Sequence, residues 1–178
     1  FPNGLVLSTG NGHDISTCQI FDNLVGISVA RSVGSFTISN NNIGVDKSGN
    51  NLSNTNTGIE VATFAGATAV PTGTISNNVI AYSSNGVQVG TARNVVISRN
   101  SIFCNSKIGI ERTATITIPT ITNATTTQVT GTAPAGSVVE VFRVNNTTCP
   151  NAPCQGGTFI GSVTTNAFGS WNLSVTSG

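Results

Sequence analysis

The pattern Ile-Ser-x-x-x-Ile occurs four times in the sequence, at residues 15–20, 38–43, 75–80 and 97–102. It alternates with segments that begin with glycine and continue with apolar residues at every second position, at 4–7, 26–29, 58–61, 86–89 and 109–112. One full period takes 23 residues from Ile15 to Ile38 and 22 residues from Ile75 to Ile97. A repeat of this length, made of short apolar segments and turns, predicts a stack of coils that bury their apolar sides against one another.

The coils are predicted to consist of β-strands. Apolar residues recur with a period of two, and the segments are rich in Val, Ile and Thr and are separated by Gly and Asn, which is a strand pattern. Parallel strands of neighbouring coils would lie about 4.8 Å apart. We therefore expect residues 1–113 to form a parallel β-helix of about four to five coils.

Stacked coils place equivalent residues in columns. The first and second isoleucines of the pattern predict two apolar columns: Ile15, Ile38, Ile75 and Ile97, and Ile20, Ile43, Ile80 and Ile102. The third residue after each first isoleucine predicts another column: Cys18, Asn41, Asn78 and Asn100. Asparagine tolerates the left-handed conformation of a bend, and stacked amides hydrogen-bond along a column. We expect this column to turn the chain and to form an amide ladder, which Cys18 interrupts.

The repeat stops after Arg112, and a second unit is predicted to follow. Residues 114–122 include Pro119 and are interpreted as a linker. Residues 123–178 contain short strand-like segments separated by Gly, Pro and Asn, a pattern that favours an antiparallel β-sandwich.

Charge and hydropathy exclude several function classes. Only 7% of the residues are charged and the net charge is +1, so the sequence predicts no binding to nucleic acid or anionic lipid. No apolar run approaches the roughly 18 residues of a membrane span, so no membrane insertion is expected. The chain begins without Met, and we expect it to be a piece of a longer protein.

The four cysteines indicate an oxidising environment. Cys149 and Cys154 flank a short loop, and we predict a disulfide between them and hence an extracellular or cell-surface location. The alternative is that these two residues are free or metal-binding thiols. Cys18 and Cys104 belong to coils about three repeats apart and are not expected to bond to each other.

Two glutamates are the candidate catalytic residues. Aligning the glycine segments places Val6, Ser28, Glu60, Gln88 and Glu111 in one outward-facing column. Glu60 and Glu111 would lie two coils apart, about 9.6 Å from the strand spacing, which is close to the upper limit for the carboxylates of an inverting glycosidase. The alternative is that both are solubilising charges on an exposed sheet.

Two long loops are the candidate binding regions. Residues 44–57 and 62–72 extend the coils on both sides of residues 58–61, and variable loops on a rigid scaffold commonly bind ligands. The first loop contains Asp46, Asn50 and Asn51, and Asp46 is a candidate calcium ligand. A polar turn is the alternative, and no other cofactor is indicated. His13 precedes Ile15 by two residues and is interpreted as a partly buried packing residue.

The repeat region resembles bacterial right-handed parallel β-helix repeat proteins, on the stretch NNIGVDKSGNN at 41–51 and the repeats around it. This resemblance covers roughly residues 3–112. The stretches TGTAPAGSVVEVF and GSVTTNAFGSWNLSV resemble the bacterial Ig-like modules of adhesins and secreted enzymes. The second resemblance implies a core of Val139, Val141, Ile160, Val163, Trp171 and Leu173, with Gly131, Gly136 and Gly169 in turns. The module is short, and an end strand is expected beyond residue 178.

The motifs of this resemblance are structural and weakly specific for function. The repeat, the neutral amide-rich surface and the absence of a convergent site favour a structural or adhesive segment of a large secreted or cell-surface bacterial protein, without catalytic activity of its own. Its partners would be adjoining domains of a longer chain, and glycans or other cell-surface proteins. The alternative is a polysaccharide-active enzyme, either a hydrolase or a lyase, or a carbohydrate-binding β-helix.

Overall fold

The computed structural model of the chain describes residues 2–61, 70–90, 94–113, 116–144, 149 and 155–175. The described residues form β-strands β1 to β18 and no helix. The chain divides into two compact units, and the larger one comprises Phe1–Ala114 together with Val144–Gly157. The smaller one comprises Thr115–Arg143 and Thr158–Gly178. All-β structure was expected from the alternating pattern of both halves.

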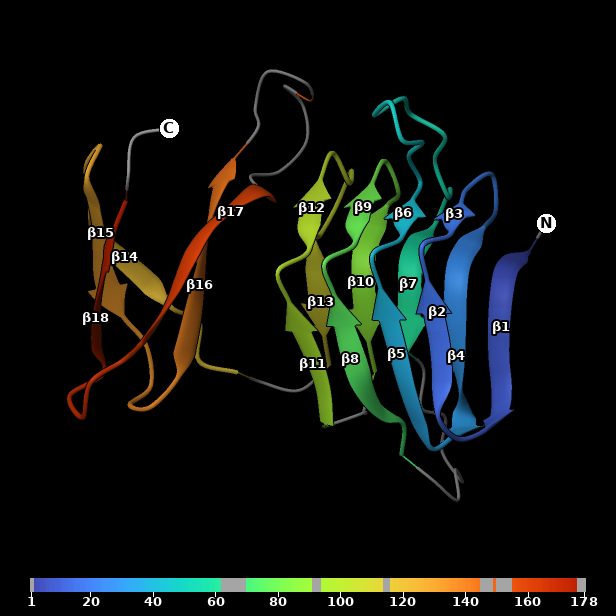
Figure 1. Cartoon of the computed structure of the whole chain (residues 1–178), viewed down its shortest axis with the longest axis horizontal. Helices are drawn as coiled ribbons and strands as arrows, with labels where there is room; N and C mark the ends of the chain where they lie inside the picture. The colour runs from blue at the N-terminus through green and yellow to red at the C-terminus, as the bar shows by residue number, and fades with distance from the viewer. Residues whose placement is uncertain are drawn as a thin grey trace. The chain divides into compact units, whose positions relative to one another are not determined.

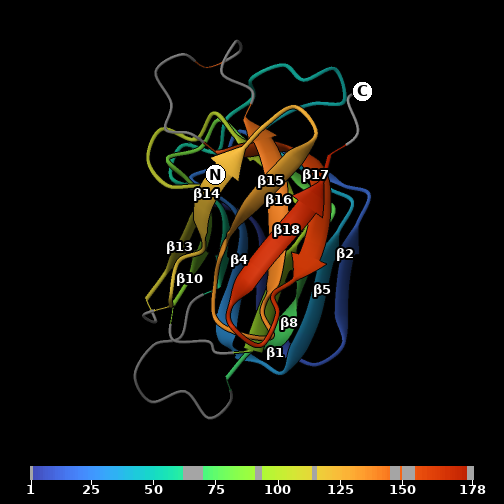
Figure 2. The same cartoon turned by 90° about the vertical axis from the view of Figure 1, so that its left-hand side faces the viewer.

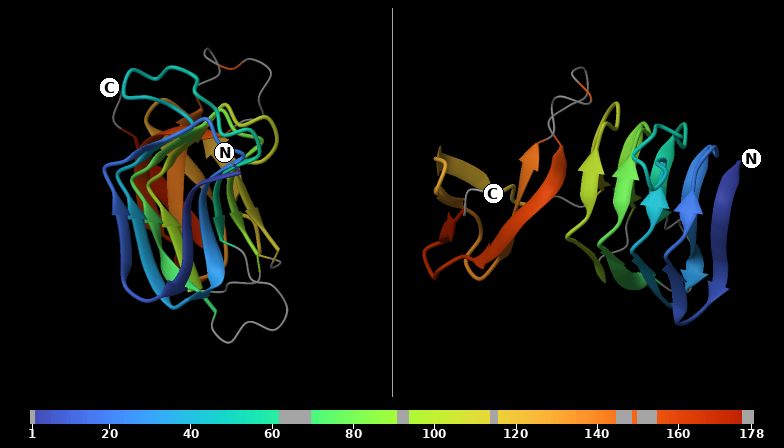
Figure 3. Two further views of the ribbon diagram at one scale, coloured as in Figure 1. Left: turned by 90° about the vertical axis from the view of Figure 1, so that its right-hand side faces the viewer. Right: turned by 45° about the horizontal axis from the view of Figure 1, so that its top comes forward.

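The first unit contains three parallel sheets, and the chain passes through them in turn (Figures 1 and 3). The first sheet has the order β1 (Asn3–Gly10), β4 (Val25–Val33), β7 (Thr57–Val61), β10 (Asn85–Val89) and β13 (Ile110–Arg112). The second has the order β2 (His13–Ser16), β5 (Ser35–Ser39), β8 (Thr72–Ser76) and β11 (Asn94–Ser98). The third has the order β3 (Gln19–Ile20), β6 (Asn42–Ile43), β9 (Val79–Ala81) and β12 (Ser101–Phe103). Each strand therefore pairs with the equivalent strand of the next coil, which is consistent with the predicted parallel β-helix.

The predicted isoleucine columns are confirmed by the strand register. Ile15 pairs with Ile38, Ile38 with Ile75, and Ile75 with Ile97. The second column continues from Ile20 through Ile43 and Ile80 to Ile102 in the same way. In the middle coils these side chains are completely buried (Ile38, Ile43, Ile75 and Ile80 are 0% exposed). The left panel of Figure 3 looks along the stack, with the coils one behind another. These columns pack in one apolar core with the inward-facing residues of the first sheet, such as Ile27, Ile59 and Val87, and burial of this core stabilises the unit.

The predicted amide ladder is also present. The backbone N–H of Cys18 donates to Asn41 Oδ1 at 2.9 Å. The N–H and Nδ2 of Asn41 both donate to Asn78 Oδ1 at 3.0 Å, and those of Asn78 donate to Asn100 Oδ1 at 3.0 and 2.9 Å. Each asparagine Nδ2 also donates to the carbonyl of an isoleucine one coil earlier, at 2.8–2.9 Å. The buried amides are thus satisfied from both sides.

The position of the left-handed residue differs from the prediction. The positive φ angles at this bend belong to Thr17, Asn40, Asn77 and Arg99, each one residue before the ladder. The ladder residue itself points inward to bridge two coils, so the preceding residue makes the turn. Two of the four bend residues are not asparagine, because the left-handed region is accessible to other residues when the surrounding structure holds them there.

The second unit contains two small sheets (Figure 2). In the first, β15 (Gln128–Thr132) pairs antiparallel with β14 (Thr120–Ala124) and with β18 (Ser170–Ser174). The second contains β16 (Val138–Val144) and β17 (Gly156–Thr164). The predicted core residues all belong to its apolar cluster: Val139, Val141 and Trp171 are buried, and Ile160, Val163 and Leu173 pack against them. The residues that the resemblance implied as a core therefore lie together in one apolar cluster.

Two details of the second unit correct the sequence-based interpretation. Gly136 and Gly169 have positive φ and lie in turns as predicted, but Gly131 lies inside β15, opposite Trp171. A Cβ at Gly131 would overlap the indole ring and the carbonyl of Thr120, so glycine is required there by the close approach of the ring. The segment 114–122, interpreted as a linker, includes the beginning of β14.

Candidate functional site

The outward column that contains the two glutamates has the predicted register. Val6 pairs with Ser28, Ser28 with Glu60, Glu60 with Gln88, and Gln88 with Glu111. Glu60 and Glu111 are both half-buried, and Glu111 Oε2 accepts a hydrogen bond from Asn85 Nδ2 at 3.3 Å. Gln88 lies between Glu60 and Glu111 in the column. The backbones of the two glutamates are therefore two strand spacings apart, or about 9.6 Å.

This spacing decides what the pair can do. A retaining glycosidase needs its two carboxyl groups about 5–5.5 Å apart, and an inverting one about 6.5–9.5 Å. The backbone spacing of about 9.6 Å is longer than the separation of a retaining pair and lies near the upper limit of an inverting pair. Neither glutamate lines either of the hollows described below.

The loop that contains Asp46 is held by the Asp46 carboxylate itself. Its Oδ1 accepts hydrogen bonds from the backbone N–H of Ser48 at 2.8 Å and of Asn50 at 2.9 Å, and its Oδ2 accepts one from Asn50 Nδ2 at 2.7 Å. The side-chain amide of Asn50, followed by these backbone donors, lowers the pKa of Asp46 below its usual 3.8. Both carboxylate oxygens thus accept hydrogen bonds within a polar turn. A polar turn was the alternative to calcium binding for Asp46. No cluster of three or more metal-binding side chains occurs in the described part of the chain.

The same loop closes over the first coil. Figure 1 shows residues 44–56 extending beyond β6, and the backbone N–H of Asp22 donates to the carbonyls of Leu52 at 3.2 Å and Ser53 at 3.1 Å. An open hollow of about 400 Å³ lies here, lined by Phe21, Asp22, Asn51, Leu52 and Ser53. Asn51 is therefore a candidate binding residue that borders a hollow. Residues 62–69 of the second predicted loop lie outside the described residues.

His13 lies at the end of the second sheet. It pairs with Phe36 in the register of β2 and β5, is half-buried, and has its Nε2 at 2.8 Å from the carbonyl of Thr9. This position agrees with the packing role expected for it.

A second amide ladder was missed from the sequence. The N–H and Nδ2 of Asn23 contact Asn54 Oδ1 at 3.2 Å, and the N–H of Ser83 donates to Asn105 Oδ1 at 3.0 Å. Asn54, Ser83 and Asn105 are buried. The signal was available, because Asn23, Ser83 and Asn105 each follow the second isoleucine of their coil by three residues, the same spacing as in the first ladder. The insertion at 44–53 hides the fourth member, Asn54.

The glycine that opens each strand of the first sheet allows close stacking beside this ladder. A Cβ at Gly26 would lie 2.6 Å from the carbonyl oxygen of Gly58, and one at Gly58 would lie 2.7 Å from that of Gly86. The same Cβ atoms would approach Asn54 Nδ2 to 2.9 Å and Ile80 Cγ2 to 2.7 Å. Glycine recurs here because backbone from the next coil occupies the space of a side chain.

The predicted Cys149–Cys154 disulfide is corrected by the structure. Cys149 is bonded to Cys104, with 5.4 Å between their Cα atoms, because the segment Val144–Gly157 belongs to the first unit and not to the second. Cys154 lies outside the described residues, and Cys18 is unpaired and exposed. The sequence spacing favoured the pair that is close in sequence, because spacing alone does not show against which part of the chain the segment Val144–Gly157 packs.

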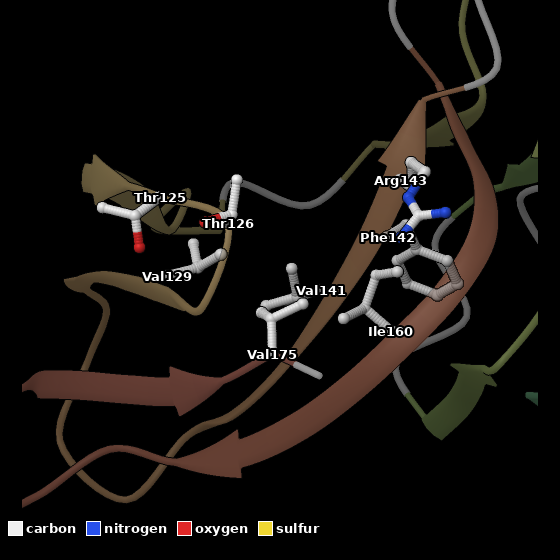
Figure 4. A pocket seen from close by; sticks show the side chains of 8 residues that line it. All are labelled: Thr125, Thr126, Val129, Val141, Phe142, Arg143, Ile160 and Val175. Carbon is white, nitrogen blue, oxygen red and sulfur yellow. The ribbon is translucent and has the colours of Figure 1, made fainter. Parts of the chain in front are cut away.

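An open groove of about 350 Å³ lies between the two sheets of the second unit (Figure 4). The side chains that line it are Thr125, Thr126, Val129, Val141, Phe142, Arg143, Ile160 and Val175. In Figure 4 Val129, Val141 and Val175 face one another, whereas Arg143 lies beside Phe142. The groove is mostly apolar and brings no pair of titratable groups together.

The sequence matches no protein-family model, and no match to it was found among curated proteins. Among the residues that the structure describes, none forms a long apolar helix of the kind that crosses a membrane.

Proposed function

We propose that the chain is a structural or adhesive segment of a large secreted or cell-surface bacterial protein and has no catalytic activity of its own. In this proposal the coils of residues 1–113 form a right-handed parallel β-helix. Residues 123–143 and 158–178 form an Ig-like module that spaces it from adjoining domains. Its partners are those domains, and glycans or other cell-surface proteins.

The observation that carries the proposal is the pair of buried amide ladders. Asn41, Asn78 and Asn100 are 1–4% exposed, and each uses its side chain to join neighbouring coils. Satisfied buried polar networks rigidify a structure and specify one arrangement of it. This ladder therefore favours a stiff stack of coils, which suits a stalk or spacer.

The disulfide supports the proposed location. Cys104 and Cys149 are paired, and disulfides persist mainly in oxidising environments such as the cell exterior. The low content of charged residues, 7%, leaves amides and hydroxyls to face solvent, which is compatible with weak polar contacts to neutral glycans.

A turnover assay separates this proposal from the enzymatic alternative. The chain is incubated with a panel of acidic and neutral polysaccharides, and products are measured as new reducing ends and as unsaturated sugars. We expect no turnover. Product formation that is abolished in Glu60→Gln, and retained in Asp14→Asn on the exposed side of β2, would defeat the non-catalytic proposal.

A glycan array tests the adhesive role. Binding that disappears when residues 47–51 are removed would identify glycans as partners and the loop 44–57 as their site. Binding that survives this deletion would place the glycan contact elsewhere on the chain.

A further inference from the structure

The second amide ladder ends on a residue from far along the chain. Both the backbone N–H and the Nδ2 of Asn105 donate to Gln155 Oε1, at 3.1 and 3.0 Å, and Gln155 Nε2 donates back to the carbonyl of Asn105 at 2.7 Å. Gln155 is 8% exposed. These two residues lie 50 positions apart in the sequence. Gln155 follows the end of the repeat, so this contact does not join two neighbouring coils of it.

Gln155 occupies the place of the next rung. A Cβ on Gly86 would lie 3.1 Å from Asn105 Nδ2, and one on Gly109 would lie 3.4 Å from Gln155 Cγ. Gln155 thus covers the glycine of the last coil as Asn105 covers the glycine of the coil before. It accepts the donors of Asn105 as Asn105 accepts the N–H of Ser83.

Two further contacts join residues near Gln155 in the sequence to the last coil. Cys104, which makes the left-handed bend directly before Asn105 with a φ of 55°, is bonded to Cys149. On β12, Ser101 Oγ donates to the carbonyl of Gly157. Cys149, Gln155 and Gly157 are therefore each attached to the last coil around the bend that follows β12.

We propose that Cys104–Cys149 and Gln155 form a redox-dependent clasp that closes the C-terminal end of the coil stack. When the disulfide is intact, it keeps Gln155 beside Asn105, and the N–H and Nδ2 of Asn105 have an acceptor in Gln155 Oε1. A dithiol reductant opens the disulfide by thiol–disulfide exchange. One of its thiolates attacks a sulfur of the bond and releases the other cysteine as a thiolate; its second thiol then displaces the first cysteine. Two protein thiols and one oxidised reductant result, so atoms and electrons balance.

Opening the bond weakens the hold of Gln155. The disulfide fixes Cys149 to the last coil, six residues before Gln155, and so raises the effective concentration of Gln155 beside Asn105. Without the bond, Gln155 departs more often, and the N–H of Asn105 then loses its acceptor. The last coil then frays while the middle coils keep their ladders.

Hydrogen exchange on the folded wild-type chain tests the clasp. Exchange of the backbone N–H of Asn105 is measured with and without dithiothreitol. The internal reference is the backbone N–H of Asn41, which donates to Asn78 Oδ1. We expect reduction to accelerate exchange at Asn105 about tenfold or more and to leave Asn41 unchanged. Unchanged exchange at Asn105 after complete reduction would overturn the proposal, and so would equal acceleration at Asn41.

Two variants and a bond assignment complete the test. Cys149→Ser should reproduce the effect of reduction without reductant, whereas Cys18→Ser, which removes the exposed free thiol, should behave like the wild type. Peptide mapping of the oxidised chain should find Cys104 joined to Cys149. A Cys149–Cys154 bond would refute the clasp. Reduction of the folded wild type gives the same comparison if Cys149→Ser does not fold.

Discussion

Truncation of Asn78 to alanine is the most direct test of the ladder as a source of stability. The Asn78 side chain is 1% exposed and makes four hydrogen bonds. Its Oδ1 accepts from the N–H and Nδ2 of Asn41, and its Nδ2 donates to the Ile38 carbonyl and to Asn100 Oδ1. Asn78→Ala removes all four bonds and leaves a small cavity.

The expected loss follows from which groups keep a partner. Asn41 Nδ2 still donates to the Ile15 carbonyl, and Asn100 Oδ1 still accepts from the Asn78 N–H. The backbone N–H of Asn41 loses its acceptor in a buried position, which costs about 1–3 kcal/mol. The cavity and the lost donor to Ile38 add about 1–2 kcal/mol. We therefore expect the free energy of unfolding to fall by about 3 kcal/mol, and Tm by roughly 10 °C.

Urea unfolding followed by far-ultraviolet circular dichroism measures this loss. The matched control is Asn94→Ala, which truncates an exposed asparagine on β11 and should change stability by less than about 0.5 kcal/mol. If Asn78→Ala is as stable as Asn94→Ala, the ladder does not stabilise the stack and the reasoning fails.

Three further predictions concern single positions of the first unit. Gly58→Ala should lower the free energy of unfolding by about 1–3 kcal/mol, because its Cβ would lie 2.7 Å from the carbonyl oxygen of Gly86; wild-type urea stability would contradict the role of the glycine column. Cys18→Asn should raise it by about 0.5–1.5 kcal/mol, because the new amide adds a donor to Asn41 Oδ1; an unchanged urea midpoint would mean that the ladder ends at Asn41. Asp46 should titrate below 3.8 in a carboxyl NMR titration, since hydrogen bonds to its charged form depress the pKa. Its contribution to loop stability is then fully present above 3.8 and is lost as the pH falls through the folded-state pKa; a midpoint at or above 3.8 would refute these bonds.

The sequence alone determined the register of the coils. A strand shifted by one residue would turn every side chain to the opposite face. The period of two within strands and the 22- to 23-residue repeat therefore leave one arrangement for Ile15 with Ile38 and for Ile75 with Ile97. The outward column of Glu60 and Glu111 followed from the same register. These features are predictable because each coil repeats the same short-range pattern.

The tertiary structure decided the features that no repeat encodes. The left-handed residue before each ladder position depends on which way the asparagine side chain must point, which only the stacked coils define. The partner of Cys149 and the role of Gln155 depend on where Val144–Gly157 packs. These contacts join residues 45 or 50 positions apart. They arise from packing at one end of the stack and occur once, so no repeated spacing in the sequence predicts them.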